Sequence, residues 1–276
     1  MPDPVFYVGA QDNKDSKKLT GFVPAKFLTR NGRYVMDPMP GGSQNAFLYS
    51  DALGSDKTKG QVANPNNYLI VPENDTEQKA RDFAARIADT WGNTQGDETG
   101  GLAGLIQAAM EMKSAFGQGG SQDLQRNPQW GIPNGSFVPA FTGSASDHLG
   151  YVTALGGLPA VLAEIAGGYV NKRNAGNQKP SDPPIDASGP HGLSWHNYHN
   201  ITQGYSDGIA ASQPPSPFND YGNDSQSERT AGQIGDGNGI AGWLAALPGV
   251  DPDEQTPSAW PPVADQPIRY LGRRTQ

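Results

Sequence analysis

A chain of 276 residues can bury a substantial apolar core, and the lack of cysteine excludes disulfides, thiol nucleophiles and cysteine-bound zinc. The formal net charge of −8 argues against a nucleic-acid-binding protein, which needs a basic face to displace counterions from phosphates. The 36 glycines and 24 prolines are about twice the average share, so we expect many turns and extended loops.

Short strands are predicted over the first 72 residues, where apolar runs alternate with turn residues. The runs cover residues 6–8, 21–23, 33–36, 46–49 and 68–71, and each is bounded by Asn, Asp, Gly or Pro. Asn31 and Gly32 separate two apolar pairs and predict a two-residue hairpin turn. We therefore expect a β-rich N-terminal extension over residues 1–75.

Two amphipathic helices are predicted next. In residues 76–91, apolar side chains recur at helical spacing, Asp75 or Thr76 can cap the start, and Gly92 can end the helix. In residues 101–116, the apolar side chains from Leu102 to Phe116 form one stripe. A Gly-rich break follows this second helix.

Residues 148–156 and 159–171 predict a pair of helices, with Asp147 as the N-terminal cap of the first. The apolar stretch 150–170 is long enough to span a bilayer. However, it contains Pro159, one ionisable group and many small residues, which favour a buried helical hairpin without stable membrane insertion.

A final helix is predicted over residues 195–209, capped by Ser194 and weakened by two internal glycines. The sequence after it is rich in proline and glycine. We therefore expect an α+β protein with a mainly α core. It comprises short N-terminal strands, a helical domain over residues 76–211 and a loop-rich, wrapping tail over residues 212–276.

The four histidines all lie between residues 148 and 199. On the helix predicted for residues 195–209, His196, His199, Gln203 and Asp207 fall within an arc of about 80°. Such a row is typical of a site built on one helix face, and acid–base catalysis by at least one of these histidines is our first hypothesis.

Two other interpretations of the histidines remain open. His196 and His199 are three residues apart and suit one divalent metal ion, with His191 or His148 as a further ligand. Asp207 is about 12 Å along the helix from His199 and is too distant to share that ion. Alternatively, the histidines lie on an ordinary polar surface without catalytic function.

His148 is a second candidate catalytic residue. An imidazole needs a nearby carboxylate to fix its tautomer and raise its basicity. The side chain of Asp147 points in another direction on a helix, so a different carboxylate must be the partner of His148.

The central region resembles the bacterial polymorphic toxin type 44 domain in the order of three segments. They are MEMKSAFGQGGSQDLQR (110–126), residues 137–168 and residues 200–208. They carry, in turn, a helix followed by Gly-Gly-x-x-Asp, a histidine before a Gly-rich helical stretch, and an Asn-Ile-x-x-Gly-Tyr helix. The chain differs from the family in the residues around its acidic position, Gln122 to Gln125.

The resemblance implies specific site residues and a biological role. Asp123 matches the acidic position of the family and His148 its histidine, so the resemblance implies Asp123 as the partner of His148. Gly120, Gly150 and Gly157 match the glycine framework of the family. Toxins of this family are delivered into rival cells by secretion machines. A cognate immunity protein would be a further partner.

The N-terminal sequence fits delivery of this kind, because it lacks the basic region and apolar core of a signal peptide. We expect a protein that is exported without a signal peptide and is secreted or injected into a target cell. Its expected function is that of an antibacterial hydrolase acting on cell-wall peptidoglycan by His/Asp acid–base chemistry. Two alternatives are a non-enzymatic structural or interaction component of a phage or injection machine, and a nuclease toxin.

Overall fold

The computed structural model describes residues 6–39, 48–49, 61–62, 64, 66–92, 100–176 and 186–212. The chain divides into two compact units, residues 1–214 and 215–276, and all described residues belong to the first. Apart from its first residue, Ser212, the tail predicted for residues 212–276 lies outside the described residues. The α+β class is confirmed, because the described residues form five α-helices together with antiparallel sheets.

The main sheet is antiparallel and has the strand order β6-β5-β1-β2-β7, with β8 also pairing with β1. Its strands are β1 (Phe6–Asp12), β2 (Leu19–Phe27), β5 (Leu48–Tyr49), β6 (Gln61–Val62), β7 (Ile70–Pro72) and β8 (Ser136–Phe137). In β1, Phe6, Val8 and Ala10 are buried while the residues between them are more exposed, as expected for a strand with one face in the core. Val8 lies opposite the buried Val23 of β2. These pairings confirm the N-terminal strands predicted from the alternating pattern.

The predicted hairpin turn is also confirmed. Strands β3 (Thr29–Arg30) and β4 (Arg33–Tyr34) flank Asn31 and Gly32, whose φ angles are 49° and 72°. Both turn residues therefore have the left-handed conformation of the tight turns that suit twisted strands. The hairpin carries Arg30 towards the helices.

Helices α1 (Glu77–Gly92) and α2 (Gly100–Phe116) agree with the predicted ranges. The cap of α1 is Thr76, whose Oγ1 accepts a hydrogen bond from the backbone N–H of Lys79 at 3.3 Å. The two helices pack against each other, with an edge contact between the rings of Phe83 and Phe116 at a centroid distance of 5.9 Å.

Helices α3 (Thr142–Leu155) and α4 (Ala160–Gly176) form the expected hairpin around Gly157. The prediction that Asp147 caps α3 is wrong, because the helix begins five residues earlier, directly after the 3-10 turn Pro139–Phe141. Asp147 is instead fully buried in the middle of α3. In the part of the chain that the structure describes, no helix combines the length and apolar character needed to cross a membrane.

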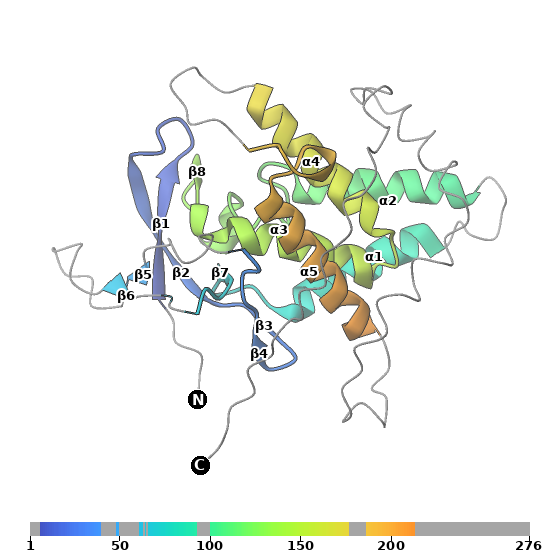
Figure 1. Ribbon diagram of the computed structural model, residues 1–276, viewed down its shortest axis with the longest axis horizontal. Coiled ribbons are helices and arrows are strands. Elements are labelled where there is room, and N and C mark those ends of the chain that lie inside the picture. The colour runs from blue at the N-terminus through green and yellow to red at the C-terminus, as the bar shows by residue number, and fades with distance from the viewer. Residues whose placement is uncertain are drawn as a thin grey trace, which may run out of the picture. The chain divides into compact units, whose positions relative to one another are not determined.

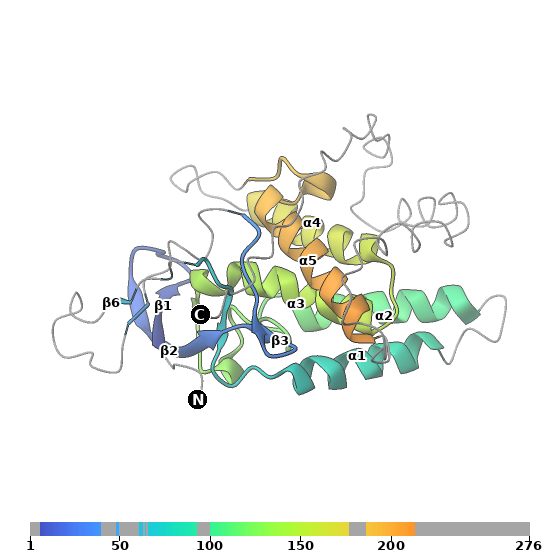
Figure 2. The same ribbon diagram turned by 60° about the horizontal axis from the view of Figure 1, so that its bottom comes forward.

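Helix α5 (Trp195–Ser212) begins as predicted at Ser194, whose Oγ accepts a hydrogen bond from the backbone N–H of Asn197 at 3.1 Å. It lies alongside α3, and these two helices make the most extensive contact between elements (Figures 1 and 2). The approach depends on glycine, since a Cβ atom at Gly204 would overlap the carbonyl oxygen of Asp147. The glycines that weaken α5 locally therefore let it pack closely on α3.

Candidate functional site

Most of the polar row predicted on α5 faces the segment that contains and follows the β3–β4 hairpin. His196 Nε2 is 2.8 Å from Oδ2 of Asp37, and the side-chain amide of Gln203 donates to the carbonyl oxygen of Met36 at 3.0 Å. Asp207, further along the helix, lies within electrostatic range of the Arg30 guanidinium. The row therefore binds a segment more than 150 residues away in the sequence.

His199 does not share this environment. Its side chain is exposed and lies against two aromatic rings of the same helix, with centroid distances of 5.9 Å to Trp195 and 5.6 Å to Tyr198. The structure thus gives His199 and His196 different neighbours, although both were predicted to belong to one site on a helix face.

The pair formed by Asp37 and His196 is the best-defined arrangement for acid–base chemistry. Both carboxylate oxygens of Asp37 lie within hydrogen-bond distance of His196 Nε2, at 2.9 and 2.8 Å. Oδ1 also accepts hydrogen bonds from the Asn200 amide at 3.3 Å and from the Met39 backbone N–H at 3.2 Å. The Asp37 side chain is fully buried, whereas 24% of the His196 side chain is exposed. The buried Asp37 carboxylate therefore faces three donors, from His196, Asn200 and the Met39 backbone.

This geometry determines which imidazole nitrogen is reactive. A carboxylate can only accept hydrogen bonds, so Nε2 of His196 carries the proton that it shares with Asp37. Among the described contacts, Nδ1 of His196 has no hydrogen-bond partner. The partly exposed ring therefore presents Nδ1 as a proton acceptor, while the carboxylate stabilises the imidazolium that forms when it accepts a proton.

Helix α3 begins beside this pair. A Cβ atom at Gly143 would lie 2.8 Å from Cδ2 of Leu69, 3.3 Å from Oδ2 of Asp37 and 3.4 Å from Cε1 of His196. The first turn of α3 has no side-chain cap. Its positive dipole end favours a nearby carboxylate such as that of Asp37 by about 0.3–1 kcal/mol.

A second polar cluster surrounds Arg30 and includes the predicted site residue Asp207. The Arg30 guanidinium donates to Oδ1 of Asp147 at 2.9 Å and lies 3.6 Å from the centre of the Tyr151 ring. Burial raises the pKa of the Asp147 carboxyl to about 7 and that of Asp75 to about 6, although Arg30 opposes both shifts. Burial also raises the pKa of Asp207.

The cluster around Arg30 has the properties of a structural junction. Arg30 and Asp147 are 7% and 0% exposed, and their ion pair joins the β3–β4 hairpin to α3. Removing one partner of such a buried pair typically costs about 3–5 kcal/mol, because the other charge is left without compensation. We therefore do not assign Asp207 a place in the acid–base pair.

His148 and Asp123 are both buried, but their hydrogen-bond partners differ from the prediction. The Nε2 atom of His148 is 2.8 Å from Oε1 of Gln122, one residue before the expected Asp123. Burial, with a further contribution from the charge of Arg30, lowers the pKa of His148 to about 3. The ring is therefore neutral at physiological pH and packs against Phe116 at a centroid distance of 5.6 Å.

Asp123 organises the Gly-rich loop in which it lies. Its carboxylate accepts hydrogen bonds from the backbone N–H groups of Gly119 and Gln125, at 2.8 and 3.0 Å, and lies 3.8 Å from Nη1 of Arg126. These are the contacts of a residue that stabilises a turn.

The histidines do not come together as ligands for a metal ion. His191 lies 3.4 Å from Glu164, while His196 and His199 face different neighbours. Within the described ranges, no group of three His, Asp or Glu side chains has an arrangement suited to a metal ion.

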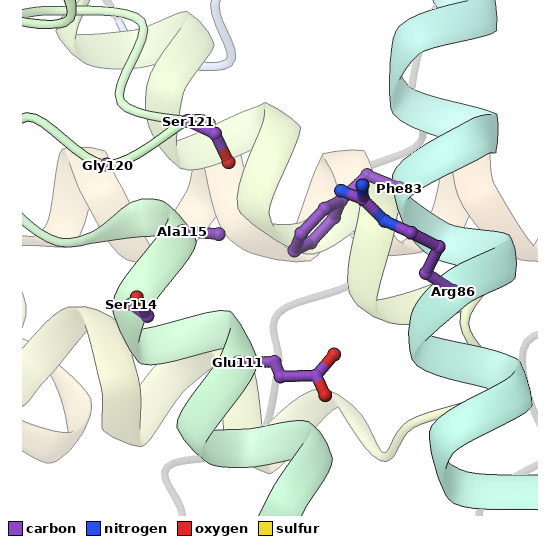
Figure 3. A pocket seen from close by; sticks show the side chains of 7 residues that line it. All are labelled: Phe83, Arg86, Glu111, Ser114, Ala115, Gly120 and Ser121. Atoms are coloured by element: carbon purple, nitrogen blue, oxygen red, sulfur yellow. The ribbon is translucent and has the colours of Figure 1, made fainter.

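A separate cavity of about 380 Å³ lies between α1, α2 and the Gly-rich loop, and Phe83 and Glu111 point into it (Figure 3). Its lining residues are Phe83, Arg86, Glu111, Ser114, Ala115, Gly120 and Ser121. It contains neither the Asp37–His196 pair nor any residue predicted to be catalytic, so we do not place the chemistry there.

Comparisons with protein-family models, with curated proteins and with solved structures give no match for this chain. The candidate site therefore rests on the distances, burial and hydrogen bonds of its own residues. Sequence reasoning selected His196 from its helical position but missed Asp37 and Asn200. Asp37 precedes a proline after a predicted strand, a context typical of an ordinary turn.

Proposed function

We propose that this protein is a hydrolase in which His196 is the general base and Asp37 orients it, and that it acts as an exported antibacterial toxin on peptidoglycan. The observation that carries the proposal is the bond from both oxygens of a buried carboxylate to a partly exposed imidazole. The toxin role rests on the resemblance of the central segments to the type 44 domain.

In the proposed reaction, Nδ1 of His196 takes a proton from a water molecule, and the hydroxide that forms adds to a carbonyl carbon. The bond from that carbon to the leaving amine then breaks, and the imidazolium returns its proton to the amine. Asp37 stabilises the imidazolium in both steps.

This chemistry favours the amide bonds of peptidoglycan over its glycosidic bonds. Glycoside hydrolases generally need two carboxyl groups on opposite sides of the scissile bond. The Asp37 carboxylate is occupied by His196, Asn200 and a backbone N–H, so it is not available as a second catalytic acid. A single oriented imidazole suits hydrolysis at a carbonyl carbon.

The test measures cleavage of isolated cell walls by the full chain and killing of bacteria that express it in the periplasm. We expect His196→Ala to abolish both activities. The matched control is His191→Ala, since His191 is also partly exposed but is paired with Glu164 instead of Asp37. This control should retain both activities.

Three outcomes would overturn the proposal. The first is a folded His196→Ala variant that cleaves cell walls as fast as the wild type. The second is toxicity in the cytoplasm with loss of nucleic acid, which would support a nuclease. The third is the absence of both cleavage and toxicity, which would favour a structural component of an injection machine.

A further inference from the structure

We propose that Trp195, Tyr198 and His199 form an aromatic platform that binds the pyranose ring of a glycan beside the Asp37–His196 pair. The inference deepens the proposed function, because it assigns a binding site to the sugar part of a peptidoglycan substrate. It also assigns His199 a role in place of catalysis.

The three side chains form one stripe because they lie at positions i, i+3 and i+4 of α5. Tyr198 meets Trp195 edge-on at an interplanar angle of 89° and a centroid distance of 5.8 Å. His199 is tilted by only 31° from the plane of Trp195. These contacts hold the indole in place while 43% of Trp195 remains exposed.

Exposed apolar side chains also occur on the two segments that supply the candidate pair. Six large hydrophobic residues are exposed among the described residues, and three of them, Tyr34, Met36 and Trp195, are on the two segments that supply Asp37 and His196. Met36 directly precedes Asp37, and Trp195 directly precedes His196. The exposed indole that directly precedes the candidate base is therefore a suitable surface for an apolar ligand face.

Charge disfavours anionic ligands at the platform. Burial raises the pKa of the Tyr198 phenol, and the negative charge of Glu164, which is paired with His191, adds to that shift. The net charge of −8 disfavours the phosphates of nucleic acids and anionic lipids as ligands. A pyranose ring is uncharged and presents a face of C–H groups that packs on an indole.

The polar edge of the platform suits sugar hydroxyls. Neither ring nitrogen of His199 has a hydrogen-bond partner among the described contacts, so one can donate to a hydroxyl and the other can accept from one. Trp195 would thus provide apolar contact and His199 directional hydrogen bonds. His196 follows Trp195 directly in α5 and lies on the neighbouring face of that helix.

The experiment titrates the full chain with a β-1,4-linked tetramer of N-acetylglucosamine, with tryptophan fluorescence and calorimetry as readouts. We expect Trp195→Ala to weaken binding on the order of tenfold or more, as for loss of one stacking ring. Trp195→Phe should restore most of the affinity, because it keeps an aromatic face. Circular dichroism checks that the variants fold.

A single-stranded oligonucleotide of thymidines serves as the competing ligand, and tighter binding of it than of the sugar tetramer would overturn the glycan assignment. The assignment is also wrong if Trp195→Ala is folded but binds the tetramer as well as the wild type, or if the wild type does not bind it.

The two proposals fail in different ways. His196→Ala should still bind the tetramer, because the platform does not need the base. If the tetramer binds through Trp195 but cell walls are not cleaved, the platform stands and the hydrolase proposal fails. If cleavage depends on His196 but Trp195→Ala changes neither the affinity for the tetramer nor KM on cell walls, the platform is wrong and the hydrolase proposal stands.

Discussion

Close packing of α5 on α3 predicts that Gly208→Ala destabilises the protein. A Cβ atom at Gly208 would lie 2.6 Å from both the carbonyl oxygen of Tyr151 and the Cβ atom of Ala154. Ordinary contacts at such positions are longer, and a backbone oxygen can move only with its helix. The two helices must therefore separate by several tenths of an ångström.

The expected magnitude follows from two opposing effects. Overpacking in a well-packed interior costs about 1–3 kcal/mol. Alanine is better than glycine in a helix by up to about 1 kcal/mol, which partly offsets the cost. The net loss in the free energy of unfolding should be about 1–2 kcal/mol, measured by urea denaturation with circular dichroism.

Gly92→Ala is the matched control for this measurement. Gly92 is the last residue of α1, and a Cβ atom there would have no neighbour within 4 Å. It should leave the free energy of unfolding unchanged or slightly raise it. A Gly208→Ala variant that is as stable as the Gly92→Ala variant would refute the packing argument.

Three further predictions concern buried polar groups. Asp37→Asn should keep the fold but lower the rate of cell-wall cleavage by a factor of about 10²–10⁴, because the orientation and charge balance of His196 are lost. Burial raises the pKa of Asp75 from 3.8 to about 6 in the folded protein. The folded protein therefore becomes less stable as the pH rises from about 4 to 6, because the buried carboxyl must ionise. Asp75→Asn should therefore raise the melting temperature more at pH 8 than at pH 4, and an equal effect at both pH values would contradict this. The imidazole of His148 should show no NMR titration between pH 5 and 8, since its pKa is lowered to about 3.

Local signals in the sequence predicted the elements that depend on neighbouring residues. The periodicity of residues 76–91, the caps at Thr76 and Ser194 and the Asn31-Gly32 turn all act within a few residues, and the structure contains each of them. The membrane-length apolar stretch was also correctly interpreted as a helical hairpin, because its glycines and its proline are local evidence.

The start of α3 was missed because its first turn is small and polar and resembles a loop. Its helical conformation is stabilised by distant partners: the hydroxyl of Ser144 donates to the carbonyl of Ile70, and Gly143 lies against Leu69. The expected link between Asp123 and His148 failed for a related reason. Sequence spacing does not reveal whether a side chain turns back into its own loop, as Asp123 does.

The same reasoning explains why only half of the candidate catalytic pair was predicted. His196 was found because helical geometry places it in a polar row, whereas Asp37 is 159 residues away and adjoins a short hairpin. The pair exists only when the segment after β4 docks on α5, and Gln203 supports that docking through the Met36 carbonyl. Proton acceptance by His196 is therefore a property of the packed sheet and helices together. Neither the N-terminal strands nor the helical region can supply the acid–base pair alone.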